Sequence, residues 1–152
     1  MPSPRVKDWM TRHPVTIHRG SSILETRELM DEEQVRRLLV LDDDGTLIGV
    51  VTAGDVREAW PSPVSSLEPF ERKAALAEIP IEEVIEHDPI SVHPDATIQE
   101  AADMMFENKI GGLPVVADGK LLGLITQSDL IRGLVRMLDE TERAERQAVP
   151  KQ

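Results

Sequence analysis

Two short segments of the sequence place a threonine three residues before an aspartate at the end of an apolar run. Thr52 and Asp55 form the pair in GVVTAGD, and Thr126 and Asp129 form it in GLITQSD. Where a strand leads into a helix, the hydroxyl and the free helix N–H groups can hold a phosphate, and the carboxylate can accept from ribose hydroxyls. The same pair also makes an ordinary N-cap, which contributes about 1 kcal/mol without any ligand. Both interpretations stay open at this point.

The two segments belong to an internal repeat. HPVTIHRGSSILETRELM at 13–30 aligns with DPISVHPDATIQEAADMM at 88–105, an offset of 75 residues from 13 to 88. Further on, RRLLVLDDDGTLIGVVTAGD at 36–55 aligns with GGLPVVADGKLLGLITQSD at 111–129, and one deletion in a turn reduces the offset to 74. Matches at this density predict two copies of one structural unit.

Each copy predicts the order strand, helix, strand, strand, helix. The first helix begins after Ser22 in one copy and after Thr97 in the other, each three residues before a glutamate, which is the spacing of a capping box. In the first copy Thr26 and Arg27 replace two alanines of the second, so its apolar stripe is weaker. The two later strands are joined through an Asp-Gly dipeptide that suits a tight hairpin.

The predicted fold class is therefore α/β (α+β), and the fold consists of two pseudo-symmetric repeats. A unit of about 55 residues buries a modest fraction of its surface, so the two are expected to pack on each other. We expect repeat 1 at 5–60, a connector with a short helix at 61–80, repeat 2 at 81–138 and a charged tail at 139–152.

The sequence also makes predictions about the connector helix, the last helix and the tail. The connector helix places Leu67, Phe70, Ala74 and Ala77 in helical register, as a linker helix over the core or as a partner-docking helix. The last helix is clearest over 129–138, and the charged tail beyond it is expected to fray.

Composition excludes several classes of function. Of the 152 residues 40% are hydrophobic, 30% charged and only 3% aromatic, so a base-stacking platform for nucleic acid is not expected. The net charge of −11 repels phosphate backbones and anionic membranes. Zero cysteines exclude disulfides and thiol chemistry. The sequence has no apolar run of membrane-spanning length, and its first residues lack the apolar stretch of a signal peptide, so a cytoplasmic protein is expected, with no nucleic acid or membrane partner.

Neither metal binding nor catalysis has a convincing set of residues. The histidines are His13, His18, His87 and His93, and no two of them have the close helical spacing of a zinc motif, so no metal site is expected. The acidic run 42–44 could touch a cation weakly, but a solvated hairpin tip is favoured. The sequence shows no nucleophile and base constellation, so the chain is not expected to be an enzyme.

At this point the residues carry a family resemblance. The paired endings GVVTAGD and GLITQSD, together with NKIGGLPVV at 108–116, make each half resemble a CBS domain, the module named after cystathionine β-synthase. The pair resembles a Bateman module, and the connector is similar to that of stand-alone bacterial CBS pairs of the acetoin-utilisation type. The resemblance covers roughly residues 5–138.

The resemblance implies adenosyl ligands, such as AMP, ADP, ATP or S-adenosylmethionine, in two clefts between the repeats, and no required cofactor. In one cleft, Thr126, Ser128 and Asp129 would face Val15, Thr16, Arg37 and Leu38, with Arg36 nearby. In the other, Thr52 and Asp55 would face Ile90, Ser91, Leu113 and Pro114. The arginines predict that the first cleft prefers phosphorylated adenosines, although such a pair of arginines can also be a solvated surface feature.

The resemblance further implies a regulatory module that reports energy or metabolite state to a separate, unknown protein. Members usually form disc-like homodimers through their helices, and the candidate surface comprises Leu130, Leu134, Val135 and Leu138 with Val56, Ala59 and Trp60. One alternative is a ligand-independent interaction or scaffold protein. A small enzyme acting on nucleotides is the other.

Overall fold

The sheets and helices fall into two units, each built from both halves of the chain. The computed structural model describes residues 3–60 and 68–148. The N-terminal unit consists of residues 13–60, 68–90 and 119–121, and the C-terminal unit of residues 3–12, 91–118 and 122–148. The predicted connector lies outside the described residues over 61–67 and belongs to the N-terminal unit from residue 68.

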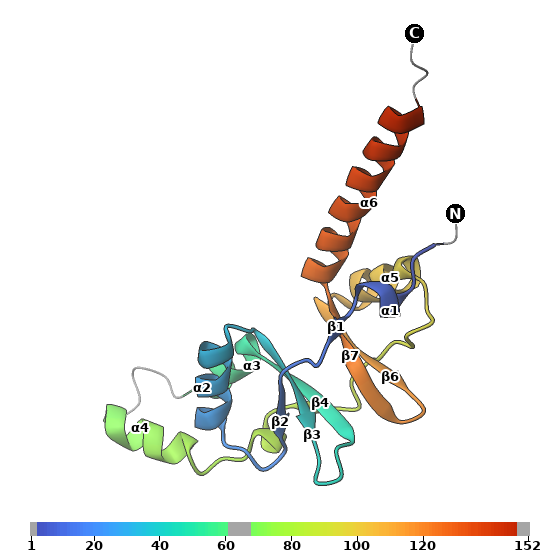
Figure 1. The fold of residues 1–152 in the computed structure, drawn as a ribbon. Coiled ribbons are helices and arrows are strands. Elements are labelled where there is room, and N and C mark those ends of the chain that lie inside the picture. The colour runs from blue at the N-terminus through green and yellow to red at the C-terminus, as the bar shows by residue number, and fades with distance from the viewer. Residues whose placement is uncertain (1–2, 61–67, 149–152) are drawn as a thin grey trace. The chain divides into compact units, whose positions relative to one another are not determined.

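The N-terminal unit is a four-stranded sheet covered by helices (Figure 1). Its strand order is β2-β3-β4-β5, with β2 parallel to β3 and the other neighbours antiparallel. The strands are β2 (Thr16–His18), β3 (Arg37–Leu41), β4 (Leu47–Thr52) and β5 (Glu86–His87), and the helices are α2 (Ile23–Glu33), α3 (Ala53–Ala59), α4 (Pro69–Leu76) and the 3-10 helix η1 (Ile81–Glu83). Its core contains Ile17, Ile23, Met30, Leu38, Val40, Val51, Val56, Leu76, Ile81 and Ile85.

The C-terminal unit repeats this plan with a smaller sheet of order β1-β7-β6. The strands are β1 (Thr11–Arg12), β6 (Gly112–Ala117) and β7 (Lys120–Thr126), and the helices are α1 (Val6–Trp9), α5 (Ile98–Asn108) and α6 (Gln127–Ala148). A parallel bridge from Val92 to Val115 stands where Ile17 pairs with Val40 in the other unit. Its core contains Val6, Val92, Ala101, Met105, Leu113, Val115 and Ile125. The repeat found in the sequence is thus confirmed by equivalent strand pairs.

The segments that lead into the two repeats are exchanged between the units. The helix α1 and strand β1 lie at the start of repeat 1, yet β1 pairs with β7 of the C-terminal unit through Thr11 and Leu124. Correspondingly, η1 and β5 lie at the start of repeat 2, yet β5 pairs with β4 of the N-terminal unit. Val6 and Ile81 are both fully buried, one in each core. Each exchanged segment therefore contributes at least one core side chain and adds one edge strand.

The predicted helix starts are confirmed at both repeats. Ser22 Oγ accepts from the backbone N–H of Glu25 at 3.0 Å, and Thr97 Oγ1 accepts from that of Glu100 at 3.0 Å. The reciprocal bond that completes a capping box is present at Thr97. Thr26, which weakened the predicted apolar stripe, is nevertheless buried, because its hydroxyl donates to the Ser22 carbonyl at 2.8 Å. A threonine can occupy this core position since its one polar group is satisfied within the helix.

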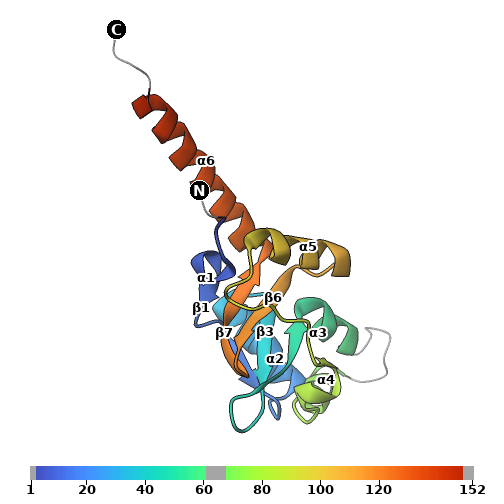
Figure 2. The same ribbon diagram turned by 90° about the vertical axis from the view of Figure 1, so that its right-hand side faces the viewer.

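The expectation that the C-terminal helix frays after residue 138 is wrong. The helix α6 continues to Ala148, and in both views its distal part projects past the other elements of its unit (Figure 2). The extension is rich in glutamate, arginine and alanine, which favour helix. Arg146 also pairs with Glu142 one turn earlier at 2.6 Å, which adds a few tenths of a kcal/mol to an exposed helix.

The connector helix is present, but the face predicted to cover the core does not do so, and the partner-docking interpretation stays a prediction. Phe70 is 82% exposed, and Ala74 and Ala77 are exposed as well, whereas Leu67 lies outside the described residues. Leu76 is the residue of α4 that enters the core of the N-terminal unit. The helix is only eight residues long, so a single buried leucine orients it rather than a stripe.

Candidate functional site: two threonine-aspartate boxes

The first threonine-aspartate pair lies where β4 becomes α3 in the N-terminal unit. Thr52 Oγ1 accepts from the N–H of Asp55 at 3.1 Å, and Asp55 Oδ2 accepts from the N–H of Thr52 at 2.9 Å. Both residues are half-buried. These two bonds form a capping box, so the N-cap interpretation holds for this pair, and the side chains stay accessible at the strand end.

The second pair has the same inner bonds where β7 becomes α6. Asp129 Oδ2 accepts from the N–H of Thr126 at 2.9 Å and from its hydroxyl at 3.1 Å, while the Asp129 N–H donates to Thr126 Oγ1 at 3.3 Å. Here the carboxylate is only 4% exposed. A buried carboxylate needs further partners, because desolvation penalises an unpaired charge.

Two residues that the sequence analysis did not identify supply those partners. Asp129 Oδ1 accepts from Arg132 Nη2 at 2.6 Å and from Thr11 Oγ1 at 3.0 Å. Arg132 lies three residues along the same helix, a spacing that could have indicated the pair. Thr11 lies on the exchanged strand β1, and nothing in the sequence near Asp129 indicates this contact. Both oxygens of Asp129 are thus occupied within the C-terminal unit.

Asp129 also lines a hollow of about 580 Å³ within its own unit, between α1, β1 and α6. Thr11, Arg132 and Arg136 share this lining with Trp9 and Val135. Two arginines and a hydroxyl therefore lie around the carboxylate on the side that α1 covers.

The other predicted site residues are distributed over both units. Thr16 is half-buried in β2, and Arg37 is half-buried at the start of β3, directly opposite Thr52 in the register of β3 and β4. Ser91 and Ser128 are exposed. The structure thus brings Arg37 beside Thr52 within one unit. The predicted facing of Arg37 and Thr126 joins residues of different units and stays a prediction.

The predicted apolar contacts differ in how much they can offer a ligand. Leu38 and Leu113 are fully buried in the cores of their own units, and Pro114 is buried too, so the two leucines present only backbone groups. Val15 packs against the core of the N-terminal unit. Ile90 is exposed and retains its side chain for contacts.

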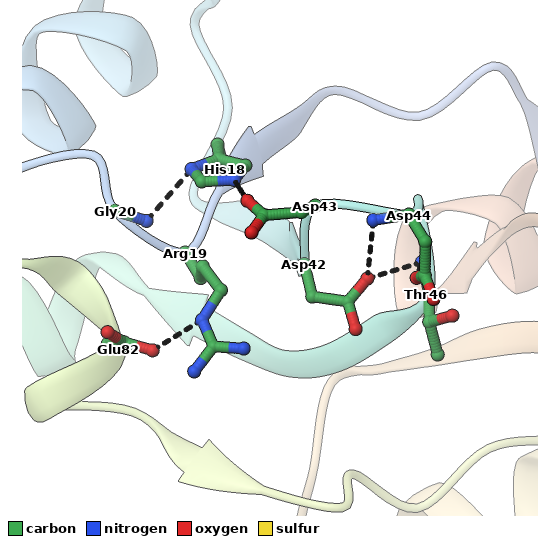
Figure 3. Close-up of polar contacts among 8 residues, drawn as sticks. All are labelled: His18, Arg19, Gly20, Asp42, Asp43, Asp44, Thr46 and Glu82. Carbon is green, nitrogen blue, oxygen red and sulfur yellow. Dashed lines mark hydrogen bonds and ion pairs between the residues drawn. The ribbon is translucent and has the colours of Figure 1, made fainter.

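The acidic run is a closed hairpin tip (Figure 3). Asp42 Oδ1 accepts from the N–H of Asp44 at 3.1 Å and from that of Thr46 at 3.0 Å. The contact with Asp42, followed by the hydrogen bonds of Thr46, lowers the pKa of Asp44 from 3.8 to about 2. His18 contacts the Asp43 carboxylate through Nε2. These groups serve the turn and its neighbouring strand, as in an Asx turn.

Ion pairs elsewhere fasten the exchanged segments. Arg19, just after β2, pairs with Glu82 of η1 at 2.6 Å. Lys7 of α1 pairs with Asp95 at 2.9 Å, and this hydrogen bond lowers the pKa of Asp95.

Within residues 3–60 and 68–148, no three histidine, aspartate or glutamate side chains gather closely enough to hold a metal ion. In the same described ranges, every helix is too short or too polar to cross a bilayer.

Two residues of the candidate dimer surface pack into the cores of their own units. Val56 is 3% exposed and belongs to the core of the N-terminal unit, so it cannot contribute to an interface. Leu130 likewise packs against the core of the C-terminal unit. By contrast, Leu134 and Leu138 are more than half exposed on α6.

The fold consists of two equivalent repeats, each with a threonine-aspartate box where a strand leads into a helix, and comparison with known proteins identifies its family. The CBS domain family matches the sequence twice, over residues 6–62 and 81–136. The chain therefore belongs to the CBS domain family and carries a tandem CBS pair.

Solved structures agree with this assignment. The chain is similar to AcuB of Vibrio cholerae, with 33% identity, a TM-score of 0.78, and coverage of 93% of this chain and 98% of that one. It is similar to the CBS domain pair of protein MJ0100 in complex with 5'-methylthioadenosine and S-adenosyl-L-methionine (27% identity, TM-score 0.73, 90% and 99% covered). CBSX2 in complex with AMP is also similar (28% identity, TM-score 0.73, 88% and 97% covered).

Curated relatives differ in length. A CBS domain-containing protein of Dictyostelium discoideum is 30% identical over 88% of this chain and 93% of its own length. Several longer relatives, including one named L-aspartate semialdehyde sulfurtransferase, are spanned by this chain over only 23% to 48% of their length. The match thus concerns the CBS pair and not the remaining parts of those proteins.

Proposed function

We propose that this chain is a regulatory module that binds an adenosine-containing ligand and acts on a separate partner protein in the cytoplasm. The observation that carries the proposal is the presence of a threonine-aspartate box at the strand-to-helix junction of both repeats. Similar CBS pairs hold AMP or S-adenosyl-L-methionine with 5'-methylthioadenosine. The candidate ligands are AMP, ADP, ATP and S-adenosylmethionine, and the module itself is not an enzyme.

Binding would regulate through the differential affinity of two states. A ligand held by groups from both repeats favours the arrangement in which those groups converge, and it thereby shifts the affinity for the partner. We include homodimer formation in this proposal. The exposed apolar residues Leu134, Val135 and Leu138 of α6 support it, because such a row is seldom left uncovered in a soluble protein.

One observation favours the ligand-independent alternative. Both boxes satisfy their own backbone groups, and Asp129 has all of its contacts within one unit. A scaffold protein needs nothing more from these residues than helix capping. The two functions are separated by whether an adenosyl compound stabilises the protein.

The test is the thermal midpoint of nucleotide-stripped protein with AMP, ADP, ATP or S-adenosylmethionine. A ligand at 100 times its dissociation constant adds roughly 2.7 kcal/mol of stability, which is readily seen as a rise in the midpoint. Asp55→Ala and Asp129→Ala are each compared with their own ligand-free midpoint. If one compound raises the midpoint and one variant abolishes the rise, the occupied box is identified. If no compound changes the midpoint, the scaffold function replaces the proposal.

The predicted preference of the arginine-bearing cleft for phosphorylated ligands has its own test. Calorimetric titration with AMP should show at least a several-fold weaker affinity for Arg37→Ala, because the guanidinium would pair with the phosphate. Arg143→Ala, on the exposed part of α6, is the control of equal charge change. Unchanged affinity in Arg37→Ala would refute the asymmetry but not adenosine binding.

A further inference from the structure

The N-terminal unit contains a second hollow that shares only Arg36 with the surroundings of the predicted clefts. It measures about 960 Å³ and lies against α2, α3 and α4. Its lining is Arg27, Met30, Asp31, Gln34, Val35, Arg36, Ala53, Val56, Arg57, Trp60 and Arg72. All of these residues belong to the N-terminal unit, and neither Thr52 nor Asp55 is among them.

The lining is strongly cationic in a chain of net charge −11. It has four arginines against one carboxylate, Asp31. Arg27 lies 4.0 Å from Asp31, at the outer limit of an ion pair. For Arg36, Arg57 and Arg72 no ion pair is found among the described residues. Guanidinium groups gathered at one concave place create a local field that attracts anions.

The rest of the lining is apolar. Met30 and Val56 are buried core residues, and Val35, Ala53 and Trp60 are half-buried beside them. The guanidinium of Arg27 lies over the Trp60 ring, 4.3 Å from its centroid, which fixes the orientation of both side chains. A hollow that joins an apolar floor to several convergent charges, at a volume in the range of small-molecule sites, has the composition of a ligand pocket.

The repeat supplies an internal control for this arrangement. At the offsets of the repeat, Arg27 corresponds to Ala102, Arg36 to Gly111, and Arg57 to Ile131. Trp60 corresponds to Leu134. The shared fold therefore does not require arginines on this face, since the C-terminal unit builds the same two helices without them. The charge is a property of one unit and calls for a separate physical explanation.

We propose that this hollow binds a small organic anion in which a phosphate group is attached to an apolar ring. The guanidinium groups of Arg36, Arg57 and Arg72 pair with the phosphate, for which their planar donor geometry is suited. The ring packs against Trp60, Val35 and Met30. This site is separate from the two threonine-aspartate boxes and does not depend on adenosine binding there.

The test uses phenyl phosphate, a phosphate monoester with a ring but no ribose or adenine. The chain has two tryptophans, so Trp9→Phe leaves Trp60 as the only indole reporter. In this background, phenyl phosphate should change the Trp60 emission saturably, whereas benzyl alcohol, which lacks the charge, should not. Inorganic phosphate should bind more weakly, because it lacks the ring. Benzoate, a carboxylate on the same ring, tests whether phosphate is preferred.

The arginines are tested in the same background. The double variant Arg57→Gln and Arg72→Gln should weaken phenyl phosphate binding at least tenfold, while Arg143→Gln, outside the hollow, should leave it unchanged. Sedimentation velocity and the ligand-free thermal midpoint establish that the variants keep the fold and assembly state of the parent. Equal binding by the double variant and the parent would overturn the proposal, as would tighter binding of benzoate or no saturation at millimolar phenyl phosphate.

The same measurements separate this proposal from the adenosine function. Asp55→Ala and Asp129→Ala should leave phenyl phosphate binding intact, and the arginine double variant should retain any AMP-induced rise in midpoint. Loss of phenyl phosphate binding in an aspartate variant of unchanged fold would assign the anion to a box and refute a separate site.

Discussion

The two threonine-aspartate boxes share their inner hydrogen bonds and differ in what surrounds the aspartate. Asp129 is nearly fully buried and receives Arg132 and Thr11 on its second oxygen. Asp55 is half-buried, and the residue at the position equivalent to Arg132 is Glu58, a like charge one helical turn away. The same motif is therefore followed, three residues after its aspartate, by a cation in one unit and by an acidic residue in the other.

This difference indicates two roles for one pattern. An aspartate whose four acceptor directions are occupied fastens β1 and α6 together, so its main effect is on stability. Asp55 has no partner on its other oxygen among the described residues and has an acidic neighbour, so it contributes less to stability and is more available to a ligand hydroxyl.

The strongest contrast is expected from removing each aspartate. Asp129→Ala should destabilise the protein by about 3 kcal/mol, because it removes the cap together with the hydrogen bonds that the carboxylate accepts from Thr11 and Arg132. Asp55→Ala should cost about 1 kcal/mol, the usual value of a lost cap. Urea unfolding of both variants gives the two free energies of unfolding. Equal losses would show that the second shell of contacts around Asp129 has no net effect.

The packing of α1 on α6 gives the next largest effect. A Cβ at Gly133 would lie 2.2 Å from Cδ2 of Trp9, so Gly133→Ala should destabilise by about 2 kcal/mol through overpacking. The equivalent positions of the N-terminal unit hold the smaller Val84 and the larger Ala59. The double variant Trp9→Val with Gly133→Ala should therefore recover part of the loss. A double-mutant cycle without coupling energy would contradict this contact.

A smaller effect is expected when the charge pattern of one box is transferred to the other. Glu58→Arg places a guanidinium three residues after Asp55, as Arg132 follows Asp129. It should stabilise the protein by about 0.5 kcal/mol at low salt, since an exposed helical pair is weak, and the gain should shrink as salt is added. Glu107→Arg, on the exposed face of α5, is a control for net charge. An equal gain in the control would assign the effect to reduced self-repulsion instead.

The smallest predicted effect is a pH dependence at the hairpin tip. The pKa of Asp44 is lowered from 3.8 to about 2 by Asp42 and Thr46. A depressed folded-state pKa means that this group stabilises the fold above pH 3.8 and that the contribution is lost as the pH falls toward 2. Asp44→Asn should flatten the unfolding midpoint between pH 4 and 2, whereas Asp118→Asn in the other hairpin should change it less. An identical pH profile for Asp44→Asn and the parent would contradict the assignment.

Local chemistry explains what could be predicted from the sequence. The capping boxes, the Asp-Gly hairpins and the order of elements depend on neighbours within a few residues, and the repeat doubled each signal. The family resemblance, carried by the two box motifs, is confirmed by the comparisons.

What escaped prediction depends on contacts between distant residues. Strands β1 and β5 have two residues each, too few to show any periodicity, so their exchange between units left no pattern. Thr11 was missed for that reason, since it reaches Asp129 only through that exchange. The α4 face was mispredicted because helical register cannot indicate which side of a short helix meets the core. The extension of α6 was missed because a charged segment was taken for a poor helix, although its propensities favour one.

The exchanged lead segments also have an evolutionary consequence. A single repeat with this connectivity carries Val6 or Ile81 and an edge strand that its own sheet does not use. A lone ancestral copy could complete its sheet only with the lead segment of a second copy, as in a domain-swapped homodimer. Duplication and fusion of such a gene would preserve the exchange inside one chain. Neither half could afterwards be lost without leaving the other half short of a strand and a core residue.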